Sequence, residues 1–241
     1  MAKDILYVLI HSPLVGPFTW ELVQQVLKKR NLQVVIPTLV DNPNSTLPFW
    51  QQHAQSVSQS LVQIPPDQKI ILVAHSGAGP LLPAIRQKLT HSIFAYVFVD
   101  AGIPRDGLSR LELMKLEDLQ WAEKFHEALL QGGQFPTWSE DDLEAIIPEG
   151  ETRRKLVAEI RPHSLPFFAE PIPVQAEWPD AACIYIKFSA SYDWDAMQAK
   201  HTGWLVHEMR AGHFHMLVDP AAVADMLVKT VQNLLDSAKL K

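Results

Sequence analysis

One stretch of the chain, residues 70–82, most constrains its fold. It begins as an unbroken apolar run, ends in small residues around Ser76, and is followed directly by the apolar residues of a helix. This pattern predicts a buried strand that turns sharply into a helix. Small residues two positions before and after the serine, here Ala74 and Ala78, let strand and helix cross closely. The stretch is typical of a nucleophile elbow, although a plain strand-to-helix turn capped by Ser76 would have a similar pattern.

Apolar runs and helix-spaced apolar stripes alternate on both sides of this stretch. Strands are predicted near residues 5–10, 32–36, 70–73, 94–99, 182–188 and 204–209. Helices are predicted between them and after Asp219, where an N-cap residue is followed by a first-turn proline. The alternation predicts an α/β fold with a mostly parallel central sheet flanked by helices. Ligands of such sheets bind outside the carboxyl ends of the strands.

The alternation stops between residues 104 and 179, which are helical and rich in proline. Helices are expected near 108–130, 141–147 and 151–160. We therefore divide the chain into a core of residues 1–103 and 180–241 and a helical insertion of residues 104–179. The insertion is expected to form a lid over the site, with extra helical packing as the alternative. Its aromatic residues would favour an apolar substrate group: Trp121, Phe125, Phe135, Trp138, Phe167 and Phe168.

Composition excludes several classes of protein. The net charge of -6, without a long basic run, argues against nucleic acid or an anionic membrane as a partner. No apolar stretch approaches the roughly 20 residues of a membrane span, and no signal-peptide pattern opens the chain. The single cysteine, Cys183, cannot form an internal disulfide. We expect a cytoplasmic protein with a small-molecule substrate and no metal or other cofactor.

A serine hydroxyl needs a base within hydrogen-bond reach, and the base needs a carboxylate to orient it. His213 follows the last predicted strand and is expected to be the base. Asp193 follows the preceding strand and is expected to be the acid, which gives the chain order Ser, Asp, His. Asp100 and Asp195 are the alternative acids.

Four other histidines have less direct roles in this interpretation. His53 lies on an apolar helical stripe and is expected to pack in the core. His11 is expected to support the loop after the first strand, and His75 to be structural or to line the pocket. His215 is expected to point away from Ser76, and no third ligand accompanies a metal site formed with His213.

Three separated motifs resemble those of the α/β-hydrolase fold family, in the family's order. Ala74-His75-Ser76-Gly77-Ala78-Gly79 resembles its elbow, and the segment from Gly212 to Pro220 resembles its histidine turn. The segment from His11 to Trp20 is similar to the first loop of the methylesterase and hydroxynitrile-lyase branch. The resemblance covers essentially the whole chain and implies a serine hydrolase.

The oxyanion hole departs from the family pattern. One donor is expected to be the backbone N–H of Gly77, directly after the nucleophile. The family's second donor position is Pro13, which has no N–H. The Leu14 N–H or the Ser12 hydroxyl is expected to replace it.

We therefore expect hydrolysis of an ester or related acyl bond through an acyl-enzyme. A lyase is the second interpretation, but Phe214 stands where hydroxynitrile lyases of the resembling branch have a lysine. A non-catalytic ligand-binding protein that kept the fold is the third.

Overall fold

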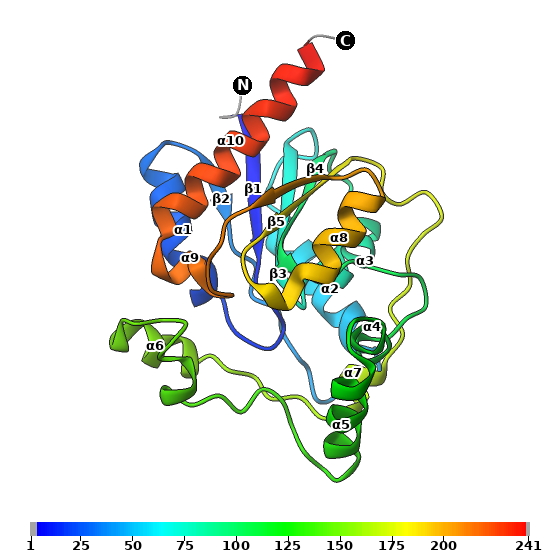
Figure 1. Ribbon diagram of the computed structural model, residues 1–241. Helices are drawn as coiled ribbons and strands as arrows, with labels where there is room; N and C mark the ends of the chain where they lie inside the picture. The colour runs from blue at the N-terminus through cyan, green and yellow to red at the C-terminus, as the bar shows by residue number, and fades with distance from the viewer. Residues whose placement is uncertain (1–3, 240–241) are drawn as a thin grey trace.

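The computed structural model describes residues 4–239, which are built around one six-stranded sheet (Figure 1). All neighbouring strands are parallel, in the order β2-β1-β3-β4-β5-β6. The strands are β1 (Ile5–Ile10), β2 (Gln33–Val35), β3 (Lys69–Ser76), β4 (Ile93–Ala101), β5 (Ala182–Lys187) and β6 (Leu205–Glu208). The predicted fold class and the six predicted strands are thus confirmed.

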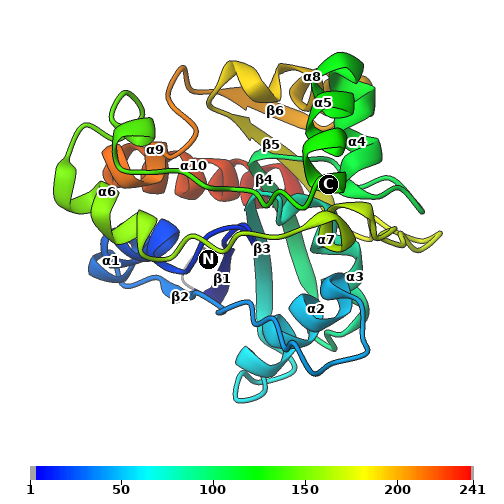
Figure 2. The same cartoon turned by 90° about the horizontal axis from the view of Figure 1, so that it is seen from below.

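Helices cover both faces of the sheet, as continuous apolar strands require (Figure 2). One face carries α1 (Phe18–Lys29) and α10 (Pro220–Lys239), and the other carries α2 (Phe49–Ser60), α3 (Leu82–Gln87) and α8 (Asp193–His201). Alternate residues of β1 enter the two cores, because successive strand side chains point to opposite faces. Tyr7 and Leu9 belong to the first core, and Val8 and Ile10 belong to the second.

The segment between β4 and β5 lies across the carboxyl ends of the strands (Figure 1). Its helices are α4 (Arg110–Glu117), α5 (Leu119–Leu130), α6 (Gly150–Val157) and α7 (Leu165–Ala169). The helix expected near 141–147 is only a 3-10 turn, Asp141–Leu143, and α7 was not predicted. A proline in the first turn of α7 made this segment resemble a loop, although that position tolerates proline.

Two carboxylates of this insertion bind the amino ends of core helices. Glu170 accepts the N–H groups of Phe49 and Trp50 at the start of α2, at 2.8 and 2.9 Å. Glu159 accepts the N–H of Phe18 at the start of α1, at 2.8 Å. Free N–H groups and the helix dipole favour negative charge there. The insertion is therefore attached to both helical layers.

Glu170 is also paired with Arg110 inside the insertion. Arg110 Nη1 lies 3.0 Å from Glu170 Oε1, and both side chains are buried. The guanidinium also covers the ring of Phe167 at 3.9 Å. Glu170 therefore joins α4, the end of α7 and the start of α2.

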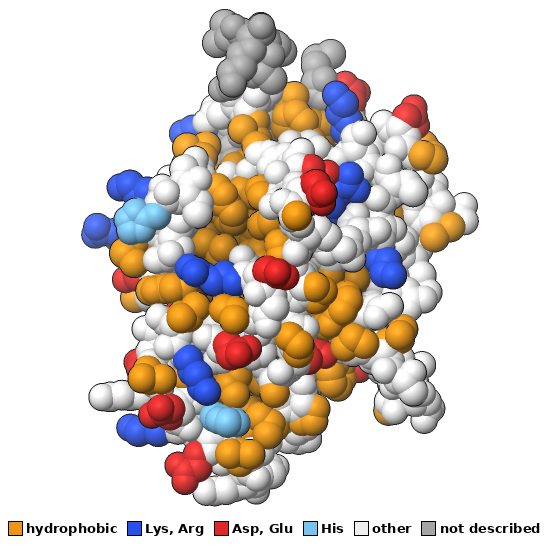
Figure 3. All heavy atoms as spheres, turned by 90° about the vertical axis from the view of Figure 1, so that its right-hand side faces the viewer, with side chains coloured by type: hydrophobic (Ala, Val, Ile, Leu, Met, Phe, Trp, Pro, Cys, Tyr) orange, Lys and Arg blue, Asp and Glu red, His pale blue; other side chains and the backbone are white. Residues whose placement is uncertain are grey.

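Two surface properties complete the description. No helix among residues 4–239 is long and apolar enough to cross a membrane. On the face seen in Figure 3, acidic and basic side chains are interspersed among apolar ones.

Candidate active site

β3 ends at Ser76 in a strained turn. Ser76 has a φ of 55°, in the left-handed region that non-glycine residues rarely adopt. Ala74 and Ala78 on either side are completely buried. A Cβ on Gly79 would lie 2.1 Å from the carbonyl oxygen of Gly102, so this close approach to the end of β4 requires glycine. The backbone at Ser76 therefore has the geometry of a nucleophile elbow.

Asp100, at the carboxyl end of the neighbouring strand β4, is the carboxylate that holds His213. Its Oδ2 lies 2.8 Å from His213 Nδ1 and 2.6 Å from the Ser189 hydroxyl. Its Oδ1 accepts the N–H groups of Phe188 and Ser189 at 2.8 and 2.9 Å. The carboxylate is fully buried, but these four hydrogen bonds replace its hydration.

The prediction that Asp193 orients His213 is wrong. Asp193 is the first residue of α8, its side chain is 62% exposed, and it forms an ion pair with Lys187. The alternative Asp195 is buried, but its Oδ1 accepts the N–H of Ile103 at 2.9 Å. The other alternative, Asp100, is the residue that contacts His213.

The ring of His213 contacts the rings of Tyr192 and His75. The ring of Tyr192 is almost parallel to it, with centroids 5.2 Å apart and planes at 11°. The ring of His75 lies 4.5 Å away, and His75 Nε2 lies 3.0 Å from the carbonyl oxygen of His213. Burial lowers the pKa of His75 well below its usual value, so this ring is neutral. His75 is completely buried and supports the backbone of His213. Of its two expected roles, this agrees with the structural one and not with lining the pocket.

Tyr192 is the site residue that sequence reasoning missed. Its phenol oxygen lies 3.0 Å from Ser76 Oγ. Among the described residues, Ser76 Oγ makes this hydrogen bond and none to Nε2 of His213. The sequence offers one signal, a tyrosine in the loop after β5 at the carboxyl edge of the sheet, but the residue type that orients a base is a carboxylate.

The loop after β1 brings Ser12 beside the turn that follows Ser76. Ser12 is buried, and its Oγ accepts the N–H of Leu14 at 3.3 Å. The same oxygen lies 3.1 Å from where a Cβ on Gly77 would stand. Because Oγ accepts from Leu14, the Ser12 hydroxyl proton is free to donate elsewhere.

The three other histidines for which the sequence predicted roles, His11, His53 and His215, lie outside the cluster of Ser76, His213 and Asp100. His11 is buried and supports the first loop: its Nδ1 lies 2.8 Å from the Ser12 carbonyl oxygen, and its Nε2 accepts the N–H of Leu39 at 3.3 Å. Burial lowers the pKa of His11 to about 4. His53 packs in the core and contacts Asp41 at 2.6 Å. His215 lies 5.9 Å from the ring of Phe188. Within residues 4–239, no group of three or more His, Cys, Asp or Glu side chains could hold a metal ion.

The charges of two carboxyl groups, those of Asp195 and Glu117, act on Tyr192. Asp195 interacts electrostatically with Glu117, at the end of α4 in the insertion. Glu117 is exposed as a residue, although its carboxyl group is partly desolvated. Burial and the neighbouring Asp195 raise the pKa of Glu117 to about 8. Burial also raises the pKa of Tyr192, and the charges of Asp100, Asp195 and Glu117 raise it further, so the phenol stays protonated.

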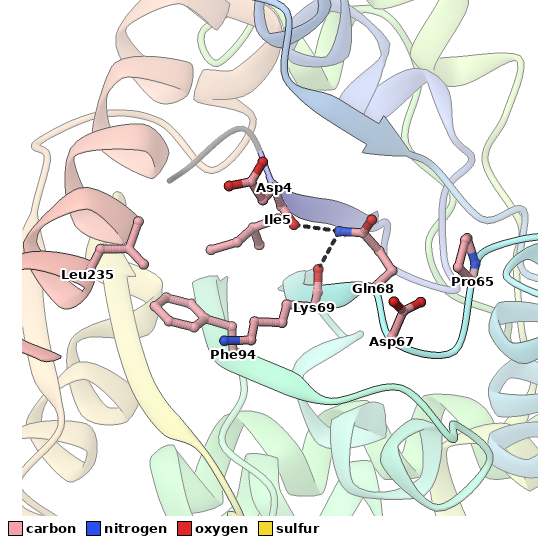
Figure 4. Close-up of a pocket in the computed structure, with 8 residues that line it drawn as sticks. All are labelled: Asp4, Ile5, Pro65, Asp67, Gln68, Lys69, Phe94 and Leu235. Carbon is pink, nitrogen blue, oxygen red and sulfur yellow. Dashed lines mark hydrogen bonds between the residues drawn. The ribbon is translucent and has the colours of Figure 1, made fainter. Parts of the chain in front are cut away.

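Two cavities lie away from Ser76. One, of about 440 Å³, is at the amino ends of the strands and is lined by Asp4, Ile5, Lys69 and Phe94, among others (Figure 4). The other, of about 660 Å³, lies between residues 41–52 and the insertion segment 161–170. The first is at the opposite end of the sheet from the cluster of Ser76, His213 and Asp100, where ligands of parallel sheets do not usually bind.

The sequence matches a family model and curated relatives over parts of its length. A model of the alpha/beta hydrolase family matches residues 7–226. Methylesterase 17 of Arabidopsis thaliana is 26% identical over 163 residues, which are 65% of this chain and 57% of that protein. Methylesterase 1 of the same plant is 28% identical over 104 residues, 41% of this chain and 40% of that protein. The chain thus matches less than two thirds of the length of these curated relatives.

Solved structures share the fold at low sequence identity. An extracellular alpha/beta-hydrolase from a Paenibacillus species has a TM-score of 0.74 and 20% identity, covering 93% of this chain and 98% of its own. Tomato methylketone synthase I, complexed with 2-tridecanone, has a TM-score of 0.71 and 15% identity, covering 95% and 98%. At this identity the likeness shows a common fold.

Glu117→Gln is expected to flatten the pH dependence of stability. The folded protein keeps the Glu117 proton up to about pH 8, whereas the unfolded carboxyl group releases it near its ordinary pKa of 4.5. The folded state binds more protons in this window, so the free energy of unfolding falls as the pH rises through it. Urea unfolding across this window should show a smaller fall in the variant. Glu123→Gln, which removes an exposed carboxylate of α5, is the control. A fall as large as that of the wild type would contradict the raised pKa.

Proposed function

Because the chain belongs to the alpha/beta hydrolase family, we propose that it hydrolyses an ester or related acyl bond of a small molecule through an acyl-enzyme on Ser76. The observation that carries this proposal is the pairing of His213 with the buried Asp100 beside the Ser76 elbow. A carboxylate on one ring nitrogen fixes the tautomer and leaves the other nitrogen basic. That is the arrangement a serine nucleophile requires.

Acylation begins when Ser76 Oγ bonds to the substrate carbonyl carbon. Nε2 of His213 takes the hydroxyl proton, while Asp100 stabilises the resulting imidazolium through Nδ1. The carbon–oxygen bond to the alcohol then breaks, and His213 gives the proton to the departing oxygen. Water repeats the sequence at the acyl carbon, which releases the acid and returns a proton to Ser76.

The oxyanion formed in each step needs two donors. The backbone N–H of Gly77 is one, by its position after the nucleophile. The Ser12 hydroxyl is the second, because it adjoins Gly77 and its proton is not used by Leu14. It takes the place of the N–H that Pro13 lacks.

The substrate is a largely apolar ester. An apolar cluster of the insertion, formed by Leu111, Leu129, Phe167 and Phe168, packs against Leu14 beside the proposed oxyanion donors. Of the other aromatics expected to favour such a substrate, Phe125 and Phe135 pack against this cluster, Trp138 packs on Phe214, and Trp121 is 47% exposed. The names of the methylesterase relatives favour a methyl ester.

Reaction with a fluorophosphonate probe tests the proposed nucleophile. The folded wild type should be labelled once, at Ser76, and should hydrolyse p-nitrophenyl acetate and butyrate. Ser76→Ala should lose labelling and at least about 1000-fold in kcat. Folded wild-type protein that is neither labelled nor active would instead support a ligand-binding protein, for which the missing N–H of Pro13 costs nothing.

A matched pair of substitutions tests the acid. Asp100→Asn should lower kcat on the order of 10,000-fold, because the amide favours the wrong tautomer of His213. Asp193→Asn should change kcat by less than about twofold, because it removes only an exposed ion pair with Lys187. Equal losses in the two variants would refute the role of Asp100.

The Ser12 hydroxyl is tested by Ser12→Ala. Loss of one oxyanion donor should lower kcat by about 100- to 1000-fold with little change in KM. Ser58→Ala, which removes an exposed hydroxyl bonded to the Lys88 carbonyl, is the control. An unchanged kcat in Ser12→Ala would assign the second donor to the Leu14 N–H instead.

A further inference from the structure

Tyr192 contacts both the proposed nucleophile and the proposed base. Its hydroxyl lies 3.0 Å from Ser76 Oγ, and its ring lies parallel to that of His213 at 5.2 Å. It reaches this position from a 3-10 turn, Ala190–Tyr192, directly after the Phe188 and Ser189 N–H groups that bind Asp100. The backbone that fixes the acid therefore also fixes this phenol.

We infer that Tyr192 is a further catalytic residue, whose O–H donates a hydrogen bond to Ser76 Oγ as His213 removes the serine proton. The inference rests on the proposed ester hydrolysis. In the resting site either oxygen can be the donor. Once the serine proton has moved to His213 Nε2, of these two oxygens only the phenol has a proton to donate, and its acceptor is the oxygen on which charge develops.

The phenol keeps its proton throughout this step. Burial raises the pKa of Tyr192, and the charges of Asp100, Asp195 and Glu117 raise it further. Tyr192 therefore cannot compete with His213 as a base. When Oγ bonds to the acyl carbon it becomes an ester oxygen, a weaker acceptor, and the hydrogen bond is lost. It forms again when deacylation expels Oγ from the acyl carbon.

The ring of Tyr192 has a separate positioning effect. Its stacking on one side, with His75 at 4.5 Å, restricts rotation of the His213 imidazole. A phenylalanine at this position would keep the stacking and lose only the donor. Phenylalanine and leucine substitutions can therefore separate the two effects.

Tyr192→Phe is the decisive variant. It should lower kcat/KM for p-nitrophenyl acetate by about 10- to 100-fold, the range expected for loss of a hydrogen bond to a charged group. The rate of fluorophosphonate labelling should fall by the same factor, because both reactions need Oγ as nucleophile. The pH at which kcat/KM is half-maximal should not move, because the ring still packs on His213. Tyr192→Leu should lower the rate further.

Tyr96→Phe is the matched control, since it removes a phenol that is bonded to Asp180 outside the active-site cluster. It should keep wild-type kcat/KM. Wild-type rates in a folded Tyr192→Phe variant would overturn the inference. A faster variant would also overturn it, by showing that the phenol withholds the serine from its base. Both results presuppose an active, labelled wild type, so they are distinct from failure of the proposed hydrolysis.

Discussion

The candidate site depends on the hydrogen bonds of the buried Asp100 carboxylate. A charged group with no exposure is tolerated only when its hydrogen bonds are complete, and here two backbone N–H groups, a hydroxyl and an imidazole complete them. These partners come from the segments after β5 and β6, so one carboxylate joins three strand ends. Asp100 itself adopts a φ of 44°, a strained conformation that the surrounding hydrogen bonds can hold. The loop that carries Tyr192 is fixed by the same bonds.

The insertion is attached to the core by charged side chains in addition to apolar contacts, such as those of Leu143, Ile147 and Leu156 with the first core. Glu159 and Glu170 bind the amino ends of α1 and α2, one in each helical layer. Each carboxylate satisfies N–H groups that a helix cannot satisfy itself. The apolar cluster of the insertion includes few core residues, among them Leu14 and Phe49. These carboxylates therefore add to the apolar contacts that position the cluster beside the Ser12 loop.

The sheet could be predicted from the sequence because its strands are short apolar runs between helix-spaced stripes. The elbow could be predicted because small residues surround Ser76. The acid could not, because Asp100 and Asp193 both follow a predicted strand, and their difference lies in which loop N–H groups face them. Phe188 and Ser189 turn toward Asp100, whereas Asp193 begins α8 and faces Lys187. The role of Tyr192 could not be predicted for a related reason. Its side chain reaches Ser76, at the end of β3, from the loop after β5, and the sequence does not show this contact.

Because Pro13 has no N–H, the proposed mechanism assigns charge stabilisation in this site partly to hydroxyl groups. A backbone N–H is held rigidly, whereas a hydroxyl rotates and must be oriented by its surroundings before it can stabilise charge efficiently. In the loop after β1, the hydrogen bond from the Leu14 N–H limits the orientation of the Ser12 hydroxyl. In the loop after β5, stacking on His213 limits the orientation of the Tyr192 ring. Both hydroxyls can donate without losing a proton at neutral pH, so neither competes with His213. Under the proposed mechanism, Tyr192 stabilises the charge on Ser76 Oγ and Ser12 that on the oxyanion, so the two charges have separate, oriented donors.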